Sequence, residues 1–276
     1  MEAKEIEHES DGRDMMSILD RVSKTESGAP RITIYGRPGI GKSTLASSFP
    51  EPLFVLTEDP ELIGIDALPI AKTFEDVWSC VKDLLKEAEE GNLPYKTIVL
   101  DSLSKLDELV IRRILDSEPP TRGGQKITTL AAACGGYGAG YARAQGVHRA
   151  FKAMMDQFKG LGIAVVYVSH LAVVKHKSPD NEDYDIFSIV MNHEKSRECY
   201  IDDVDAVLYC KLKAYTTETE SGRTIIKSTS DHVIIPGVNE GNVSKNRFNM
   251  PAEIPMTFDA IKQYIPFYKE LNDNAG

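Results

Sequence analysis

Short apolar runs recur along the chain and are separated by longer amphipathic stretches. The pattern predicts strands at 31–35, 53–57, 97–100, 163–169 and 206–211, and its clearest helices at 74–90 and 146–160. Strands that alternate with helices pair in parallel through right-handed crossovers. The central runs are almost continuously apolar, which is typical of strands covered on both faces. The chain is therefore expected to form an α/β fold with a mostly parallel sheet flanked by helices.

The C-terminal part has a different pattern. Two short strands are predicted at 224–227 and 232–235, each flanked by turn residues. Strands of this kind often extend the edge of a parallel sheet in the antiparallel sense. A last helix is expected at 258–268, interrupted by Pro266. The predicted fold therefore ends in an antiparallel extension.

Four segments do not fit the alternation. Residues 1–13 are dominated by Glu and Asp and predict a disordered acidic tail, which leaves 14–276 as a single domain. Residues 15–22 predict a short amphipathic helix packed on that domain. Residues 119–146, rich in Gly, Ala and Thr, and residues 171–193 fit neither a strand nor a helix. Long connections inside a compact domain are usually functional or disordered.

Composition excludes several classes of protein. The 276 residues are 42% hydrophobic and 27% charged, which is ordinary for a globular chain. No apolar run is long enough to span a bilayer, and the acidic start lacks the apolar core of a signal peptide. The four cysteines are scattered without C-x-x-C spacing, so neither zinc nor a disulfide framework is indicated. We expect a cytoplasmic protein without a membrane partner.

The formal net charge of -10 argues against a strongly basic surface for nucleic acid. It does not exclude a local basic groove, because charges beyond a Debye length of about 10 Å contribute little at a contact.

The strongest chemical signal follows the first predicted strand. It is a complete G-x-x-x-x-G-K-[ST] phosphate loop, formed by Gly36, Arg37, Pro38, Gly39, Ile40, Gly41, Lys42 and Ser43, with Thr44 opening a helix. Glycines let successive N–H groups turn inward toward a phosphate chain, and the helix N-terminus adds positive potential. Lys42 is expected to reach the β- and γ-phosphates and Ser43 to hold Mg²⁺. The motif predicts binding of ATP or GTP; the alternative is a glycine-rich turn that binds nothing.

Acidic residues at two other strand ends could complete the site. Asp101 ends the predicted strand at 97–100 and could hold Mg²⁺ directly or through water, or simply cap the strand. Hydrolysis also needs a group that orients or deprotonates the attacking water, and Ser102 is too weak a base. Glu58 is the nearest substitute, with Asp59 and Glu61 as close competitors.

Two further polar groups have a functional and a simpler interpretation. Ser169 and His170 end another apolar strand, where they could contact the γ-phosphate, or form a helix cap and a partly buried histidine. Lys245 and Arg247 form a compact basic pair near the end of the chain. They could contact phosphate across a subunit interface, or belong to a solvated face.

In this order the motifs resemble the RecA-like recombination ATPases, and most closely the small phage-encoded members that accompany single-strand annealing proteins. The resemblance covers about residues 30–255 and includes the segment 244–251, which looks like the basic finger of the family. It implies that Glu58 activates water, that His170 stands where RecA itself carries glutamine, and that Lys245 and Arg247 reach the nucleotide of a neighbouring subunit. The histidine sensor, the extra segment 119–146 and the absence of RecA's additional terminal domains are departures from RecA.

The resemblance also implies a magnesium-dependent ATPase of a phage recombination system, located in the bacterial host cytoplasm, that forms homo-oligomers and is stimulated by DNA. The expected partners are single-stranded DNA and a phage annealing or single-strand-binding protein. By position, residues 171–193 match the DNA-contacting loop of the family. The candidate DNA contacts are Lys175, Lys177, Arg122 and Lys126, with Arg112, Arg113, Tyr137, Tyr141 and Phe187 as further candidates.

Two other functions remain open from the sequence. A small-molecule phosphotransferase would use the same phosphate loop and Asp101, although no arginine-rich lid is evident. A nucleotide-dependent module that loads or recruits a replication protein would use the phosphate loop without a role for Glu58.

Overall fold

The computed structural model describes Val22 and residues 28–60, 62–121, 123–177, 182–218, 224–237 and 239–273. The predicted tail at 1–13 lies outside these residues, as does all of the predicted helix at 15–22 except Val22. Within the described part of the chain, no helix is both long and apolar enough to cross a membrane.

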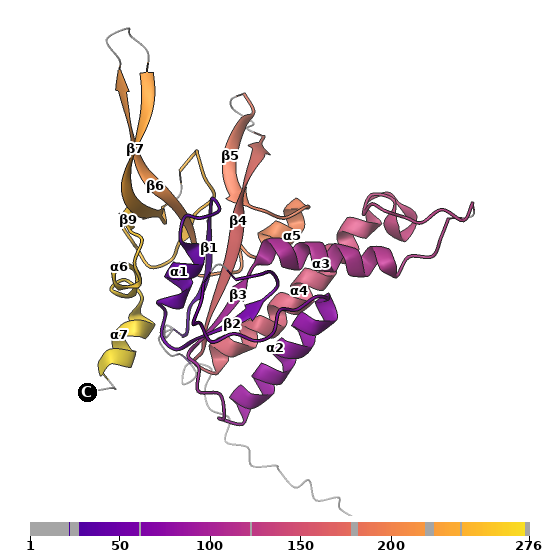
Figure 1. The fold of residues 1–276 in the computed structure, drawn as a ribbon, viewed down its shortest axis with the longest axis horizontal. Coiled ribbons are helices and arrows are strands. Elements are labelled where there is room, and N and C mark those ends of the chain that lie inside the picture. The colour runs from indigo at the N-terminus through magenta and orange to yellow at the C-terminus, as the bar shows by residue number, and fades with distance from the viewer. Residues whose placement is uncertain are drawn as a thin grey trace, which may run out of the picture.

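One mixed sheet organises the domain (Figure 1). Its strands are β1 (Arg31–Gly36), β2 (Pro52–Leu56), β3 (Thr97–Asp101), β4 (Ala164–His176), β5 (Tyr184–Ile189), β6 (Ala206–Glu218), β7 (Thr224–Ile235), β8 (Lys245–Asn246) and β9 (Ile254–Pro255). The order β2-β3-β4-β1-β6 is parallel throughout, and β7 and β9 continue it antiparallel. The predicted mostly parallel sheet with an antiparallel extension is confirmed.

Helices cover both faces of this sheet. They are α1 (Lys42–Ser47), α2 (Phe74–Glu89), α3 (Leu103–Asp116), η2 (Ala133–Gly135), α4 (Ala139–Gly160), α5 (Glu194–Glu198), α6 (Phe258–Lys262) and α7 (Pro266–Asp273). Alternate side chains of each central strand point to opposite faces. In β4, Tyr167 joins the cluster under α2, α3 and α4, whereas Val166 joins the cluster under α1, α6 and α7.

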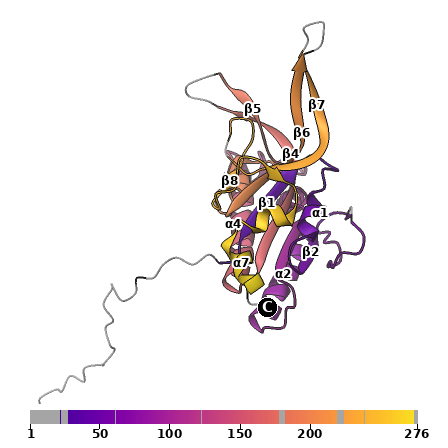
Figure 2. The same cartoon turned by 90° about the vertical axis from the view of Figure 1, so that its left-hand side faces the viewer.

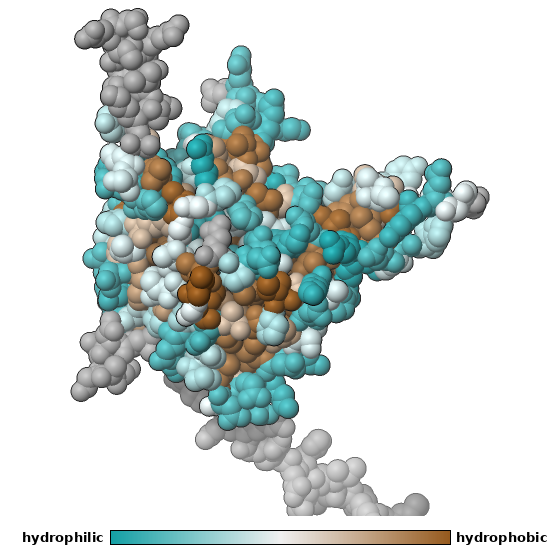
Figure 3. Space-filling view, in the orientation of Figure 1, coloured by the Kyte–Doolittle hydropathy of each residue, from teal (hydrophilic) through white to brown (hydrophobic). Residues whose placement is uncertain are grey.

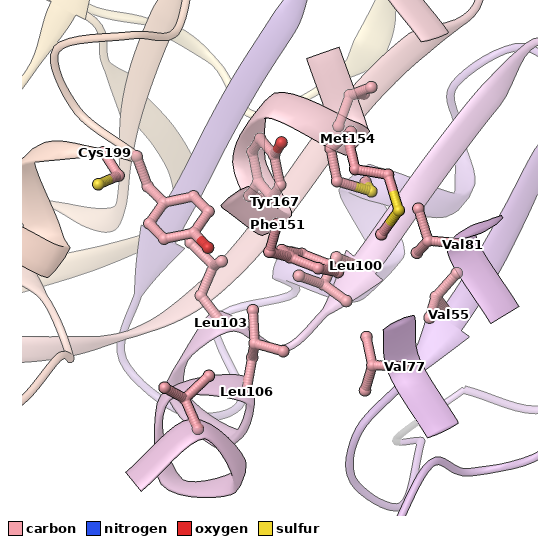
Figure 4. Close-up of a cluster of buried hydrophobic side chains, with 14 of the residues drawn as sticks. Val55, Val77, Val81, Leu100, Leu103, Leu106, Phe151, Met154, Tyr167 and Cys199 are labelled. Atoms are coloured by element: carbon pink, nitrogen blue, oxygen red, sulfur yellow. The ribbon is translucent and has the colours of Figure 1, made fainter. Parts of the chain in front are cut away.

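The larger core packs helices α2, α3 and α4 against the sheet. Figure 4 shows Leu100 and Tyr167 from the strands among side chains of these helices, including Val77 and Phe151. The helix α2 begins with a reciprocal capping box, in which Thr73 and Asp76 each accept a backbone N–H of the other. On the outer surface in Figure 3, apolar residues gather over the middle of the domain near α2.

The largest correction concerns residues 171–193, for which no regular structure was predicted. The sensor strand β4 does not stop at residue 169 but continues to His176, where it pairs with β5 as an antiparallel hairpin. The part of β4 after residue 170 is short and mixes apolar with basic residues, so it does not show the alternation by which a strand is recognised in a sequence. In Figures 1 and 2 this hairpin, here called the sensor arm (171–176 with 184–189), extends beyond the body of the sheet.

A second arm is also longer than predicted. β6 extends from the predicted end at 211 to Glu218, and β7 is one strand where two short ones were expected. Their pairing is interrupted only by an irregularity between Leu212 and Ala214. This hairpin, the β6–β7 arm (211–218 with 224–232), projects beside the sensor arm (Figure 2).

The helices differ from the predicted boundaries in two places. α4 begins at Ala139 rather than at residue 146, so only 119–138 remain largely irregular, and α3 together with α4 forms a projection from the domain (Figure 1). The glycines at 140 and 146 weakened the helix pattern. The expected final helix is divided, with α7 beginning at Pro266, because proline lacks an N–H and fits the first turn of a helix.

Gly140 provides a test of this corrected boundary. A Cβ placed there would lie 2.1 Å from the carbonyl oxygen of Leu130, so Gly140→Ala must displace the loop that packs on α4. We expect a loss of about 1–3 kcal/mol in the free energy of unfolding, measured by urea denaturation. Gly146→Ala is the matched control, because nothing lies within 4 Å of its added Cβ. It should stabilise the helix by roughly 0.5–1 kcal/mol; equal stability of the two variants would contradict the packing described.

Candidate functional site

The phosphate loop connects the end of β1 to the start of α1. Gly39 and Gly41 have φ values of 71° and 94°, which non-glycine residues rarely adopt. At Gly36 the constraint is space, since a Cβ would lie 2.5 Å from the carbonyl oxygen of Cys210 on the neighbouring β6. Leu45 N donates to Gly41 O at 2.9 Å, so the loop runs directly into the first helical turn. This is the strand–loop–helix arrangement that a phosphate chain requires.

Lys42 lies at the first position of α1, and only 6% of it is exposed. Its Nζ donates to the carbonyl oxygen of Arg37 at 3.2 Å, so the side chain crosses the loop from its end to its beginning. An ammonium held in this position faces the ring of backbone amides, where it can meet the oxygens of a phosphate chain.

The Ser43 hydroxyl donates to Asp101 Oδ2 at 2.6 Å. This contact joins α1 to the carboxyl end of β3. Burial raises the pKa of Asp101, and the hydrogen bond from Ser43 opposes that rise. A hydroxyl and a carboxylate are the oxygen ligands that Mg²⁺ takes when most of its other positions hold water and phosphate. The described residues contain no cluster of three or more His, Cys, Asp or Glu side chains suited to a metal ion. Ser43 and Asp101 supply this hydroxyl and carboxylate at one place, so they fit a magnesium shared with a nucleotide.

Glu58 follows β2 and meets groups from two other strand ends. Its Oε1 accepts a hydrogen bond from the hydroxyl of Ser102, and His170 Nε2 lies 3.2 Å from the same oxygen. The hydrogen bond from His170 holds the pKa of Glu58 below its usual value, against the effect of burial. The competing Asp59 is exposed and Glu61 lies outside the described residues. Glu58 is thus the acid that contacts the ends of both β3 and β4.

Hydrogen bonds fix the strand ends around this carboxylate. Ser102 N donates to Thr57 Oγ1 at 2.8 Å, and the Thr57 hydroxyl donates to Ser102 O at 2.9 Å. The peptide bond between Asp101 and Ser102 is cis. On the other side, His170 N donates to Ser104 Oγ at 3.0 Å. Thr57 and Ser104 were not among the predicted site residues; the signal for them in the sequence is a small hydroxyl side chain close to each strand end.

The side chains of Ser169 and His170 point to different partners. The Ser169 hydroxyl is buried at hydrogen-bonding distance, 3.2 Å, from Ser104 Oγ and therefore belongs to the support of β4. The His170 side chain is 35% exposed and reaches Glu58, while its Nδ1 is buried without a hydrogen-bond partner in the described residues. His170 is therefore the polar group of this strand that faces the site.

The basic pair lies elsewhere. Lys245 in β8 pairs with the beginning of β6 and donates to the carbonyl oxygen of Asp202. Arg247 Nη1 is 3.0 Å from Asp205 Oδ1, just before β6. Parallel strands begin at one edge of the sheet and end at the other, so this pair occupies the edge opposite the phosphate loop. It does not join the nucleotide site of its own chain.

The candidate DNA contacts fall into two separate groups. Lys175 and Lys177 lie at the end of the β4 segment in the sensor arm. Lys126 lies on the α3–α4 projection, where its Nζ is 2.8 Å from Asp116 Oδ1, and Arg122 lies outside the described residues. The structure does not bring the two groups together as one surface.

The additional candidates are mostly engaged in packing. Arg113 pairs with Glu75 at 2.6 Å and lies 5.1 Å above the ring of Phe74, while Arg112 borders the cavity between α2 and α3. Of the aromatic candidates, Tyr141 stacks on His193, Phe187 lies 5.6 Å from Tyr209, and Tyr137 is fully exposed. Tyr137 is thus the aromatic side chain among them that is open to a partner.

A phosphate loop after β1, an aspartate at the end of the non-adjacent strand β3 and the parallel order β2-β3-β4-β1-β6 are the arrangement of a RecA-like P-loop fold. The sequence matches the family described as AAA domain over residues 29–248, and the chain belongs to that family.

Two other comparisons, with solved structures and with curated proteins, were less informative than the family match. The flagellar accessory protein FlaH from Methanocaldococcus jannaschii is similar in structure with a TM-score of 0.34 and 12% sequence identity. The match covers 75% of this chain and 77% of FlaH. The comparison with curated proteins finds no match.

The contact of Glu58 with His170 can be tested by titration. In His170→Ala the pKa of Glu58 should rise toward its ordinary value, because the strongest influence that lowers it is removed. Lys105→Ala should have a smaller effect, since Lys105 contributes least. The measurement is the carboxyl ¹³C shift of Glu58 as a function of pH.

The lowered pKa of Glu58 also determines how the stability of the fold depends on pH. A lowered pKa means that Glu58 stabilises the fold above its unfolded-state pKa and that this contribution disappears as the pH falls through the folded-state value. His170→Ala should therefore lose stability at neutral pH and approach the wild type in acid. An unchanged titration of Glu58 would reject the contact.

Proposed function

We propose that this protein is a magnesium-dependent ATPase of a phage DNA recombination or single-strand annealing system, oligomeric and stimulated by single-stranded DNA. The observation that carries the proposal is the continuity of β4. The same strand bears His170 against Glu58 and, without interruption, runs on to Lys175 in the sensor arm.

Each side chain of the site has a part in hydrolysis. Lys42 neutralises charge on the β- and γ-phosphates, and Ser43 with Asp101 holds Mg²⁺, which when bound offsets the charge of the phosphate oxygens. Glu58 orients and deprotonates the attacking water. The lowered pKa of Glu58 keeps it ionised at neutral pH, and its Oε1 already accepts two hydrogen bonds that fix its direction. An oriented carboxylate acceptor is the group this step requires.

His170 links the chemistry to the sensor arm. A change at the γ-phosphate alters the contact between His170 and Glu58, and any shift of β4 moves the residues that follow it. Lys175 is five residues further along a continuous strand, about 17 Å at the usual rise per residue. Coupling over this distance needs an element with two arrangements; the hairpin of the sensor arm is the candidate.

Contact with DNA is proposed for Lys175 and Lys177 on the sensor arm. Neutralising phosphates with lysine releases counterions, so such binding weakens as salt rises. The net charge of -10 restricts this contact to a local site. Lys126 and the residues around it on the α3–α4 projection are less suited, because Lys126 already pairs with Asp116.

Oligomerisation is proposed from the position of Lys245 and Arg247. They lie at the edge of the sheet opposite the phosphate loop, and β1 alone spans about 20 Å between the two edges. They can therefore contact a nucleotide only in a neighbouring subunit. The phage setting, the host cytoplasm and a phage annealing or single-strand-binding partner rest on the motif order of the sequence.

The test is ATP hydrolysis measured with and without single-stranded DNA at two salt concentrations. We expect stimulation by DNA that decreases at the higher salt, because the proposed contact is to phosphates. Lys42→Ala should abolish turnover, and Glu58→Gln should retain ATP binding but hydrolyse slowly.

The possible results separate the candidate functions. Normal hydrolysis by Glu58→Gln would reject Glu58 as the group that activates water. Turnover that requires a small acceptor and ignores DNA would identify a phosphotransferase. Partner binding that depends on ATP without detectable hydrolysis would identify a loader.

The proposed action in trans has its own test. Lys245→Ala combined with Arg247→Ala should reduce ATPase activity, because the neighbouring nucleotide loses two cations. Mixing this double variant with Lys42→Ala should restore part of the activity, since mixed assemblies contain interfaces in which both halves are intact. Assembly is verified by light scattering; mixed assemblies without any recovery would show that the pair does not act across the interface.

A further inference from the structure

A buried set of polar side chains lies between α3 and α4, apart from the phosphate loop. Asp107 of α3 is 2% exposed and His148 of α4 is fully buried, and His148 Nε2 lies 3.0 Å from Asp107 Oδ1. On the other side of the ring, His148 Nδ1 lies 3.1 Å from the hydroxyl oxygen of Tyr200, which is fully buried as well. None of the steps assigned above uses these three side chains.

The second carboxylate oxygen of Asp107 holds the end of the sensor arm. Asp107 Oδ2 accepts hydrogen bonds from Asn192 N and from Asn192 Nδ2, both at 2.8 Å. Asn192 follows Ile189, the last residue of β5, by three positions. Between them, Val190 N donates to His170 O at 3.1 Å, where the two strands of the arm meet the sheet. The chain that leaves the arm is therefore fastened to α3 by a buried carboxylate.

The charge of Asp107 is maintained by its partners. Burial would raise the pKa of Asp107, but hydrogen bonds from His148 and Asn192 outweigh it and hold that pKa below its usual value. The carboxylate therefore stays ionised at neutral pH and accepts on both oxygens. A buried ion pair adds little net stability compared with apolar packing, whereas loss of one partner leaves an uncompensated charge. What this contact specifies is the position of Asn192.

The helix α3 connects this contact to the nucleotide site. Its N-cap residue, Ser102, donates to Glu58. In the first turn, Ser104 Oγ accepts the hydrogen bond from His170 N. Asp107 follows Ser104 by three residues, about 4.5 Å along the helix and on the same face. The helix therefore contacts the root of the sensor arm twice, at β4 through Ser104 and beyond β5 through Asp107.

The far side of the buried set is anchored in the sheet. The ring of Tyr200 packs edge-on against Tyr167 of β4, with ring centroids 5.2 Å apart, and Tyr200 O accepts a hydrogen bond from the hydroxyl of Thr33 on β1 at 2.7 Å. Asn192, in contrast, is exposed. The three buried side chains are therefore a fixed frame, and Asn192 is the partner that can leave it.

We propose that Asp107 is a positioning residue of the sensor arm, which through Asn192 holds the arm in the arrangement that passes DNA binding on to the nucleotide site. The proposal rests on the proposed function and adds a second connection, through α3 and the end of β5, to the continuity of β4. With Asn192 released, the arm is held by β4 alone, and DNA bound near its tip no longer displaces α3. Basal hydrolysis is unaffected, because Asp107 and Asn192 lie outside the nucleotide site.

Asn192→Ala tests this anchor, since it removes the side-chain donor at an exposed position and leaves the buried residues in place. We expect basal ATP hydrolysis equal to that of the wild type. Stimulation by single-stranded DNA should fall about tenfold, because one hydrogen bond to a charged group is lost. Hydrogen exchange of the backbone amides at 171–176 and 184–189, followed by mass spectrometry without DNA, should become several times faster.

Exchanging the two partners gives a sharper test. Asn192→Asp alone places two carboxylates against each other and should remove the stimulation more completely than Asn192→Ala. Combined with Asp107→Asn it again places an amide opposite a carboxylate, so part of the stimulation should return. A residue with only a structural role would change stability, measured by urea unfolding, without separating basal from DNA-stimulated hydrolysis.

Asn92→Ala is the matched control. Asn92 is an exposed asparagine after α2, at the other end of the domain from the sensor arm (Figure 1), and its amide donates to Glu90 at 3.2 Å. This variant should leave hydrolysis and exchange unchanged. Normal stimulation of Asn192→Ala, unchanged exchange in its arm, or an equal loss of basal and stimulated hydrolysis would overturn the role of Asp107 while leaving the proposed function intact. A wild type that hydrolyses ATP without any response to DNA would overturn both.

Discussion

The early end of β1 is the constraint on which the rest of this molecule depends. Gly36 lies between His170 on β4 and Cys210 on β6, and its approach to β6 leaves no room for a side chain. Here β1 turns into the phosphate loop, whereas β4 and β6 continue to His176 and Glu218. The phosphate loop therefore lies between the two strands that continue into the arms.

Around the phosphate loop, hydrogen bonds between polar side chains join strand ends that apolar packing holds together elsewhere in the sheet. Glu58 gathers the ends of three neighbouring strands through Ser102 and His170, and Ser43 joins the nearby helix to Asp101. Buried polar groups are costly unless hydrogen-bonded, and a connected set of them fixes one arrangement. Each contact also places a donor or acceptor where a phosphate, a metal ion or water can compete for it, so the network suits both rigidity and change.

The sequence was sufficient for the core strands and for the phosphate loop, because apolar runs and a glycine-lysine motif are local signals. Asp101, Glu58 and His170 could be located at strand ends, but their mutual contacts depend on sheet order, which no local pattern contains. The arms were missed because strands that leave the body of the sheet lack a buried face and its alternation. α4 was shortened because Gly140 resembles a breaker, although its small size serves the packing of Leu130.

Asp205 is the centre of the charge cluster at the opposite edge of the sheet. Its carboxylate is approached by Arg31, Lys159 and Arg247, and hydrogen bonds from Arg31 lower its pKa in spite of burial. Three cations share this carboxylate, and Arg31 also pairs with Asp156 at 3.1 Å. Arg247 can swing away without leaving a bare anion behind, since two counterions stay in place. Arg247 is the most exposed of the three cations, so its departure from the cluster would reduce the stability of the fold only slightly.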